Sequence, residues 1–167
     1  NFRSEIGVLF LNSYNRDVLT KMFDDNRLTY TSLFKARPHI FVSKSNPLAK
    51  HEVVSLEDLE DFPYLSYDQG IHNSFYYSEE ILSQIPHKKS IVVSDRATLF
   101  NLLIGLDGYT IATGILNSNL NGDNIVSIPL DIDDEIDIVY LKHEKATLSK
   151  MGEKFLDNLV KEVTFDN

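Results

Sequence analysis

Short apolar runs alternate with helical patterns through the middle of the chain, and this alternation limits the possible folds more than any other feature. Predicted strands occupy 64–67, 90–94 and 109–113, and predicted helices lie around 73–85 and over about 96–106. Strands and helices that alternate at these lengths are typical of a mostly parallel, doubly wound sheet. We therefore predict an α/β fold.

The two ends of the chain extend this pattern. The nearly all-apolar run 5–11 predicts a buried strand, and a helix with apolar residues on one face follows it. Further strands are expected at 39–43, 124–130 and 135–141. The last helix carries one apolar stripe, formed by Met151, Phe155, Leu156, Leu159, Val160 and Val163.

Composition narrows the function classes. The 167 residues are 43% hydrophobic and 25% charged, as in soluble globular proteins, and the formal net charge is -9. So acidic a surface disfavours direct contact with nucleic acid, which is itself a polyanion. The absence of cysteine excludes a disulfide framework and a thiolate metal site. No apolar run approaches the roughly 20 residues that span a bilayer, and the chain begins with Asn1 rather than methionine, so we expect a part of a larger protein.

Three strand ends are candidate ligand sites. Ligands of open α/β sheets bind beyond the carboxyl ends of the strands, where helices begin. This rule selects 12–13, 67–74 and 94–98, all rich in hydroxyl and amide side chains. The first amides of a helix lack partners and carry partial positive charge, so such an end suits a carboxylate or a similar anion.

The segment YDQGIHNSF, residues 67–75, has two interpretations. As a ligand loop, it offers a glycine for close backbone approach, polar donors and aromatic walls. As an ordinary connection between a strand and a helix, it needs only a helix cap at Asn73 or Ser74. The residues alone leave both open.

The segment from Ser94 to Leu116 is mostly structural in character. Asp95 or Ser94 is expected to cap a helix, and Arg96 to be solvated or ion-paired. Thr113 and Gly114 indicate either a close neighbour or a turn. The apolar residues of the helix are predicted to be core: Leu99, Phe100, Leu102, Leu103 and Leu106.

Catalytic and metal-binding patterns are missing. The sequence has no Gly-x-Ser-x-Gly elbow, no phosphate-binding glycine loop and no His-Glu-x-x-His. The acidic run 130–137 lacks the glycine and the distal glutamate of a calcium loop, which indicates a solvated turn. We predict no enzymatic activity, no cofactor and no metal site.

Two long segments resemble those of a known family. HIFVSKSNPLAKHEVVSLEDLEDFPYLSY, residues 39–67, resembles the part of LysR-type transcriptional regulators in which a strand leads to an HPLA element, a capped helix and an fPyi strand. VVSDRATLFNLLIGLDGYTIATGIL, residues 92–116, is similar to the family's following helix and strand. The sequence departs from the family at Asn46, where histidine is usual, and at 107–109 and 113–115, which replace a glycine and proline pattern.

The resemblance implies the effector-binding domain of such a regulator. That domain has the two-lobed fold of class II periplasmic binding proteins, with a small molecule held between the lobes. Residues 1–44 and 137–167 would form the first lobe and 45–136 the second, joined by crossing strands near 40–43 and near 124–130 or 135–141. The family's first two strands of lobe one are missing from this sequence, so preceding residues or a partner chain would cover the open sheet edge.

The resemblance also implies partners. We expect a homodimer or tetramer in the cytoplasm, no membrane contact, and DNA binding only through a winged helix-turn-helix domain that this chain does not contain. The effector would be a small carboxylate or amino-acid-like metabolite, such as an O-acylated serine or homoserine. The predicted effector-binding residues are Asn12, Ser13, Tyr67, Gln69, Gly70, Asn73, Ser74 and Thr113.

Narrower and alternative assignments accompany this prediction. The runs 67–82, 94–103 and 108–114 are similar to the Gram-positive branch of the family that controls sulfur amino-acid metabolism. A solute-binding protein of a transport system would have the same fold, but its gene would encode a signal peptide or lipidation site upstream. An enzyme domain would need an activated nucleophile or an acid and base pair, which the sequence does not indicate.

Overall fold

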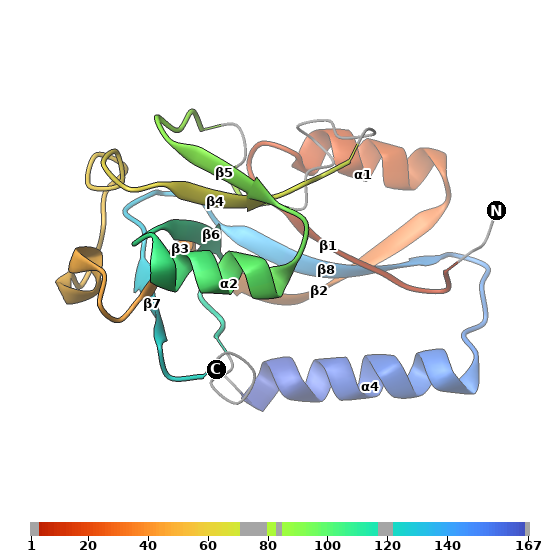
Figure 1. The fold of residues 1–167 in the computed structure, drawn as a ribbon. Helices are drawn as coiled ribbons and strands as arrows, with labels where there is room; N and C mark the ends of the chain where they lie inside the picture. The colour runs from red at the N-terminus through yellow and green to blue at the C-terminus, as the bar shows by residue number, and fades with distance from the viewer. Residues whose placement is uncertain (1–3, 71–79, 83–84, 117–121, 166–167) are drawn as a thin grey trace. The chain divides into compact units, whose positions relative to one another are not determined.

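The computed structural model describes residues 4–70, 80–82, 85–116 and 122–165. The chain divides into two compact units, one formed by 1–36 with 135–167 and the other by 37–134. Each unit contains its own sheet (Figure 1). The assignment of 1–44 with 137–167 and of 45–136 to two effector-domain lobes stays a prediction.

The first unit is built on a three-stranded antiparallel sheet. The long strand β8 (Ile136–His143) pairs with β1 (Gly7–Leu11) on one side and with β2 (Leu28–Ala36) on the other (Figure 1). Helix α1 (Arg16–Asp25) connects β1 to β2, and α4 (Lys150–Phe165) follows β8. β1 and β2 are therefore the edges of this sheet among the described strands.

The core of the first unit lies between α1 and the sheet. Leu19 and Phe23 stand four residues apart on α1, which places them on one face of the helix, and both are buried. They pack with Leu11 of β1 and with Val139 and Leu141 of β8. Burial of each such side chain contributes about 1.5–3 kcal/mol, so this apolar face fixes α1 on the sheet.

The second unit contains a five-stranded mixed sheet in the order β5-β4-β6-β3-β7. β4 runs parallel to β5 and β6, whereas β3 runs antiparallel to β6 and β7. The described elements of this unit are β3 (His39–Ser43), the 3-10 helix η1 (Pro47–Lys50), β4 (Tyr64–Tyr67), β5 (Ser90–Val93), α2 (Arg96–Gly105), β6 (Tyr109–Ala112) and β7 (Ile125–Pro129).

Helix α2 packs on this sheet against β3 and β4 (Figure 1). Leu99 and Leu103 of α2 are almost fully buried and form the helix side of the core. Phe41, Leu65, Val93 and Ile125 supply the side of the strands. The predicted core helix is thus confirmed at its two central positions.

Leu106 does not belong to this core. It follows the last residue of α2 and remains 46% exposed, so its prediction as a core residue was wrong. Asp107, the next residue, takes a positive φ of 50° and turns the chain toward β6. The helix therefore ends before Leu106 can point at the sheet.

The sequence prediction of a mixed α/β fold is confirmed, but the predominance of parallel strands was wrong. Among the described strand pairs, only those of β4 with β5 and β6 are parallel. Strand β2 was missed because its polar and apolar residues alternate only weakly: Thr29, Tyr30, Thr31 and Ser32 are all exposed. Without β2, the antiparallel sheet of the first unit could not be predicted.

The apolar stripe of α4 is largely open to solvent in the described structure. Met151 is 77% exposed, Phe155 50% and Val160 43%, whereas Leu156 and Leu159 are half-buried. The side chain of Val163 lies outside the described residues. The start of α4 is anchored by Ser149, whose amide and hydroxyl both donate to the carboxylate of Glu5 at 2.9 Å.

Candidate functional site

The carboxyl ends of β4, β5 and β6 meet at one edge of the five-stranded sheet, because these strands run in the same direction. A backbone hydrogen bond of 2.8 Å from Asp68 to Val93 joins the ends of β4 and β5. We call this edge, formed by 67–70, 94–98 and 113–114, the site edge. Four of the predicted effector-binding residues, namely Tyr67, Gln69, Gly70 and Thr113, lie in these segments.

The loop after β4 is held by its own polar groups. The amide of Gly70 donates to Oδ1 of Asp68 at 2.9 Å, and Nε2 of Gln69 lies 3.4 Å from the carbonyl oxygen of Tyr67. Gly70 takes a φ of +73°, and a Cβ added there would meet no other described atom within 4 Å. Glycine is needed here for the left-handed backbone.

Tyr67 is a half-buried side chain near a positive charge. Burial raises the pKa of its hydroxyl, and the charge of Arg96 acts in the opposite direction. The Arg96 guanidinium also lies 4.7 Å from the centre of the Phe100 ring, a cation–π contact. Arg96 is thus a cation at the site edge, a role that sequence reasoning did not assign to it.

The amino end of α2 is already occupied by a carboxylate. Asp95 caps the helix, as predicted: its Oδ1 accepts from the amide of Thr98 at 2.9 Å, and the Thr98 hydroxyl donates to its Oδ2 at 2.7 Å. The hydrogen bond from the Thr98 amide lowers the pKa of Asp95. An external anion would meet this negative charge, so α2 does not offer the vacant helix end that the sequence suggested.

Gly114 is small because an imidazole lies against it. A Cβ at this position would stand 2.6 Å from Nδ1 of His39, and the φ of Gly114 is +87°. The close neighbour and the turn that the sequence indicated as alternatives therefore both occur at Gly114. His39 therefore lies beside the site edge, and the sequence did not single it out, since only the antiparallel pairing of β3 with β6 reveals its position.

Asn12 and Ser13, the predicted residues of the first unit, follow β1. Asn12 is buried, and its Oδ1 accepts from the amides of Tyr14 and Asn15 at 3.1 and 3.0 Å. Asn15 returns the interaction, because its Oδ1 accepts from the Asn12 amide at 2.9 Å. The carboxamide of Asn12 thus shapes the turn into α1, while Ser13 is exposed.

A buried carboxylate lies next to this turn. Asp137 of β8 pairs with Leu11 in the sheet, and its Oδ2 lies 3.3 Å from Nη2 of Arg16 on α1. The hydroxyl of Ser32 donates to the other carboxylate oxygen. No local pattern predicts this cluster, since 121 residues separate Arg16 from Asp137.

Asn73 and Ser74 lie outside the described residues, so their positions remain predictions. No group of histidine, cysteine, aspartate or glutamate in the described ranges is arranged to hold a metal ion. No described helix is both long and apolar enough to cross a membrane.

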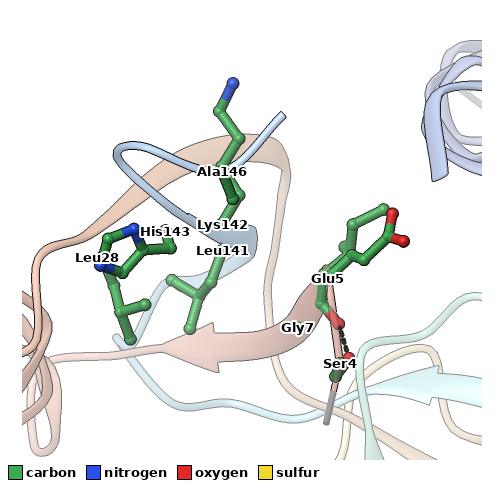
Figure 2. A pocket seen from close by; sticks show the side chains of 9 residues that line it. Ser4, Glu5, Gly7, Leu28, Leu141, Lys142, His143 and Ala146 are labelled. Atoms are coloured by element: carbon green, nitrogen blue, oxygen red, sulfur yellow. Dashed lines mark hydrogen bonds between the residues drawn. The ribbon is translucent and has the colours of Figure 1, made fainter. Parts of the chain in front are cut away.

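Two cavities among the described residues lie away from the predicted site residues. One, of about 450 Å³, is in the first unit at the amino end of β1; in Figure 2, Leu28 and His143 lie on one side of it and Glu5 on the other. The second, of about 290 Å³, lies in the second unit beside Leu59, His87 and Tyr109. Neither cavity is lined by a predicted effector-binding residue.

Comparison with solved structures shows the fold. The chain is similar to HinK, a LysR family transcriptional regulator from Pseudomonas aeruginosa, with a TM-score of 0.64, 16% identity, and coverage of 96% of this chain and 53% of HinK. It also resembles the BenM effector binding domain with its effector benzoate, at a TM-score of 0.61 and 20% identity, covering 96% of this chain and 69% of that one. The regulatory domain of NMB2055 (MetR), a LysR family regulator from Neisseria meningitidis, gives a TM-score of 0.62 at 12% identity, covering 98% of this chain and 72% of that domain.

The chain therefore spans about half the length of HinK and about 70% of the isolated effector domains. No curated protein sequence matches it significantly. The family model of the LysR substrate binding domain matches residues 14–164, which is most of the chain. This protein belongs to the family of LysR substrate-binding domains.

Proposed function

We propose that this chain is the effector-sensing domain of a LysR-type transcriptional regulator, acting by binding and not by catalysis. The observation that carries the proposal is the match of the LysR substrate binding domain over residues 14–164. The same observation disfavours a transport-type solute-binding protein, although the fold would suit both. The sulfur amino-acid branch stays a prediction.

We further propose that the effector is a small carboxylate or amino-acid-like metabolite. Among the similar structures, BenM is described with benzoate, QuiR with shikimate and CcmR with 2-PG. In this chain, the site edge offers amide and hydroxyl groups at Gln69, Gly70 and Thr113, with the cation of Arg96 nearby. Arginine is suited to planar, bidentate recognition of a carboxylate.

The proposed effector residues are those predicted from the sequence, with Arg96 added. Tyr67, Gln69, Gly70 and Thr113 would act from the site edge, and Asn12 would act by shaping the turn that presents Ser13. Binding would shift the balance between conformations of the domain only in proportion to its differential affinity for them. DNA recognition, the homodimer or tetramer, and a cytoplasmic location are proposals for the whole protein, in keeping with the net charge of -9 of this part.

A thermal-shift screen followed by calorimetry tests the proposal. A metabolite that binds only the folded chain raises its thermal midpoint by mass action, and we expect hits among small carboxylates such as O-acetylserine and O-acetylhomoserine. Gln69→Ala and Arg96→Ala should each weaken the best hit about 10-fold or more, as expected when a hydrogen bond to a charged group is lost. Asn101→Ala, an exposed amide on α2, is the matched control and should leave affinity unchanged. Equal affinity in all three variants would remove the site edge from the binding site.

A further inference from the structure

The carboxylate of Glu80 contacts both ends of β4. Its Oε1 accepts a hydrogen bond from the backbone amide of Tyr67, the last residue of the strand. Its Oε2 lies 3.4 Å from the hydroxyl of Tyr64, the first residue. The Tyr67 contact is the stronger of the two, because 3.4 Å is long for a hydroxyl donor.

Aromatic rings surround the Tyr64 end of this arrangement. Tyr64 is buried and stacks on His87 with ring centroids 3.8 Å apart, and Nδ1 of His87 lies 2.8 Å from the hydroxyl of Tyr109. Burial raises the pKa of Tyr109 to about 12 and lowers the pKa of His87, so both are neutral at pH 7. Burial also raises the pKa of Tyr64.

Glu80 is thus an acid in surroundings of low polarity. Burial raises the pKa of its carboxyl, and the hydrogen bonds from the Tyr67 amide and the Tyr64 hydroxyl oppose that rise only in part. Among the described residues, the titratable groups around it include Tyr64, His87 and Tyr109, together with the Tyr67 hydroxyl, on which Arg96 and Asp95 also act. Tyr64, His87 and Tyr109 are neutral at pH 7. On acidification, Glu80 takes up its proton above the ordinary glutamate pKa, whereas His87 takes up its proton only below the ordinary histidine pKa.

We propose that Glu80 is a positioning residue that holds the start of the Tyr67–Gly70 loop through the Tyr67 amide, and that proton uptake by Glu80 loosens this part of the loop. A carboxylate is a stronger acceptor for an amide than a carboxylic acid, about twofold in energy. Above the pKa of Glu80 the Tyr67 amide is held by the carboxylate. Below it this hold weakens, while the hydrogen bonds of Asp68 with Val93 and with Gly70 remain. The link to effector binding rests on the proposed function of this loop.

Proton uptake by Glu80 should affect the stability of the fold and the hydrogen bond to Tyr67 in opposite directions. Because the pKa of Glu80 is raised on folding, its contribution to stability is fully present below the unfolded pKa and is lost as pH rises through the folded value. Acid therefore stabilises the fold through Glu80 while it loosens the loop.

The test is an NMR pH titration of the full chain labelled with nitrogen-15. In the wild type, we expect the Tyr67 amide resonance to titrate with a pKa above the ordinary glutamate value, and in Glu80→Gln this titration should vanish. Hydrogen exchange at the Tyr67 amide should be about five- to ten-fold faster at pH 7 in the variant. The exposed Glu57→Gln is the control and should leave the Tyr67 titration unchanged.

A second variant keeps the test decisive if Glu80→Gln folds poorly. Tyr64→Phe removes only the weaker hydrogen bond to the ionised form, so the Tyr67 titration should persist with a higher midpoint. A Tyr67 amide that does not titrate in the wild type, or that titrates equally in Glu80→Gln, would overturn the proposal.

The link between Glu80 and effector binding is tested with O-acetylserine as the probe. Its affinity should fall with decreasing pH in the wild type and depend less on pH in Glu80→Gln. Identical pH dependence of binding in both proteins overturns the link between Glu80 and binding. If the Tyr67 titration vanishes in Glu80→Gln but O-acetylserine does not bind at any pH, the hydrogen bond between the Tyr67 amide and Glu80 is supported. The proposed ligand class is then contradicted instead.

Discussion

Arg16 and Asp137 form an ion pair that joins α1 to β8 in the first unit, with Nη2 and Oδ2 3.3 Å apart. The two partners are unequally exposed, since the Asp137 side chain is 7% accessible and that of Arg16 38%. Water can therefore solvate Arg16 if its partner is lost, whereas the buried Asp137 relies on Arg16 and Ser32, with the charge of Lys35 also acting on it. The loss of Arg16 should therefore change the stability of the chain by a different amount from the loss of Asp137.

We predict that Arg16→Met destabilises the chain by about 1–3 kcal/mol, because it leaves a buried carboxylate without its cation. Asp137→Asn should cost less, about 1 kcal/mol or below, since Asn keeps an acceptor for Ser32 and leaves a partly solvated arginine. The double variant should resemble Asp137→Asn alone. Urea unfolding followed by circular dichroism measures all three, and strictly additive effects would contradict the pairing.

Gly114→Ala should be more destabilising than Gly70→Ala, although both positions have positive φ. The left-handed backbone costs each variant about 1–2 kcal/mol. At Gly114 the new methyl also meets His39, which adds about 1–3 kcal/mol of overpacking. The test is whether His39→Ala, introduced into Gly114→Ala, recovers this excess in thermal unfolding; no recovery would mean that the imidazole is not the cause.

Leu103→Ala and Leu106→Ala form a matched pair on consecutive turns at the end of α2. Leu103 is fully buried, so its truncation should cost about 2–5 kcal/mol through the cavity that it leaves. Leu106 is half-exposed, and its truncation should stay within about 0.5 kcal/mol. Comparable losses in chemical denaturation would indicate that Leu106 is packed after all.

The pH dependence of stability should carry the signature of His87. Burial lowers its pKa in the folded chain, so the unfolded chain binds the proton more readily, and stability is lost as pH falls below about 6.5, the ordinary histidine value. His87→Phe keeps a ring against Tyr64 and loses the hydrogen bond to Tyr109, which should lower the stability by about 1 kcal/mol near pH 7. The thermal midpoints of the wild type and of His87→Phe should therefore approach each other as pH falls from 7 to 5. A difference that stays constant over this range contradicts the assignment to His87. His51→Phe, at an exposed histidine, is the control.

The elements that a local pattern specifies were predicted well. β4 lies at 64–67 as expected, α2 begins at Arg96 behind its Asp95 cap, and Leu99 and Leu103 face the core. Hydrophobic periodicity and capping depend on neighbours within a few residues, so the sequence contains the information directly.

The relationships that depend on distant residues could not be predicted in this way. β2 has a weak alternation and becomes a strand because β8, more than 100 residues later, supplies its hydrogen bonds. The approach of His39 to Gly114 and the pairing of Arg16 with Asp137 likewise follow from sheet register. Candidate site residues were therefore chosen by loop chemistry, whereas their neighbours Arg96, His39 and Glu80 emerged only from the structure.

β1 is hydrogen-bonded by β8 on one side, and no other described strand pairs with it. The backbone groups along its other side form a ready template for a strand from another molecule, and Val8, 49% exposed, adds an apolar contact beside them. In concentrated samples of this chain, β1 is where we expect fibril growth to start. Val8→Lys would place a charge beside the unpaired side of β1 and should slow the aggregation of the protein during storage.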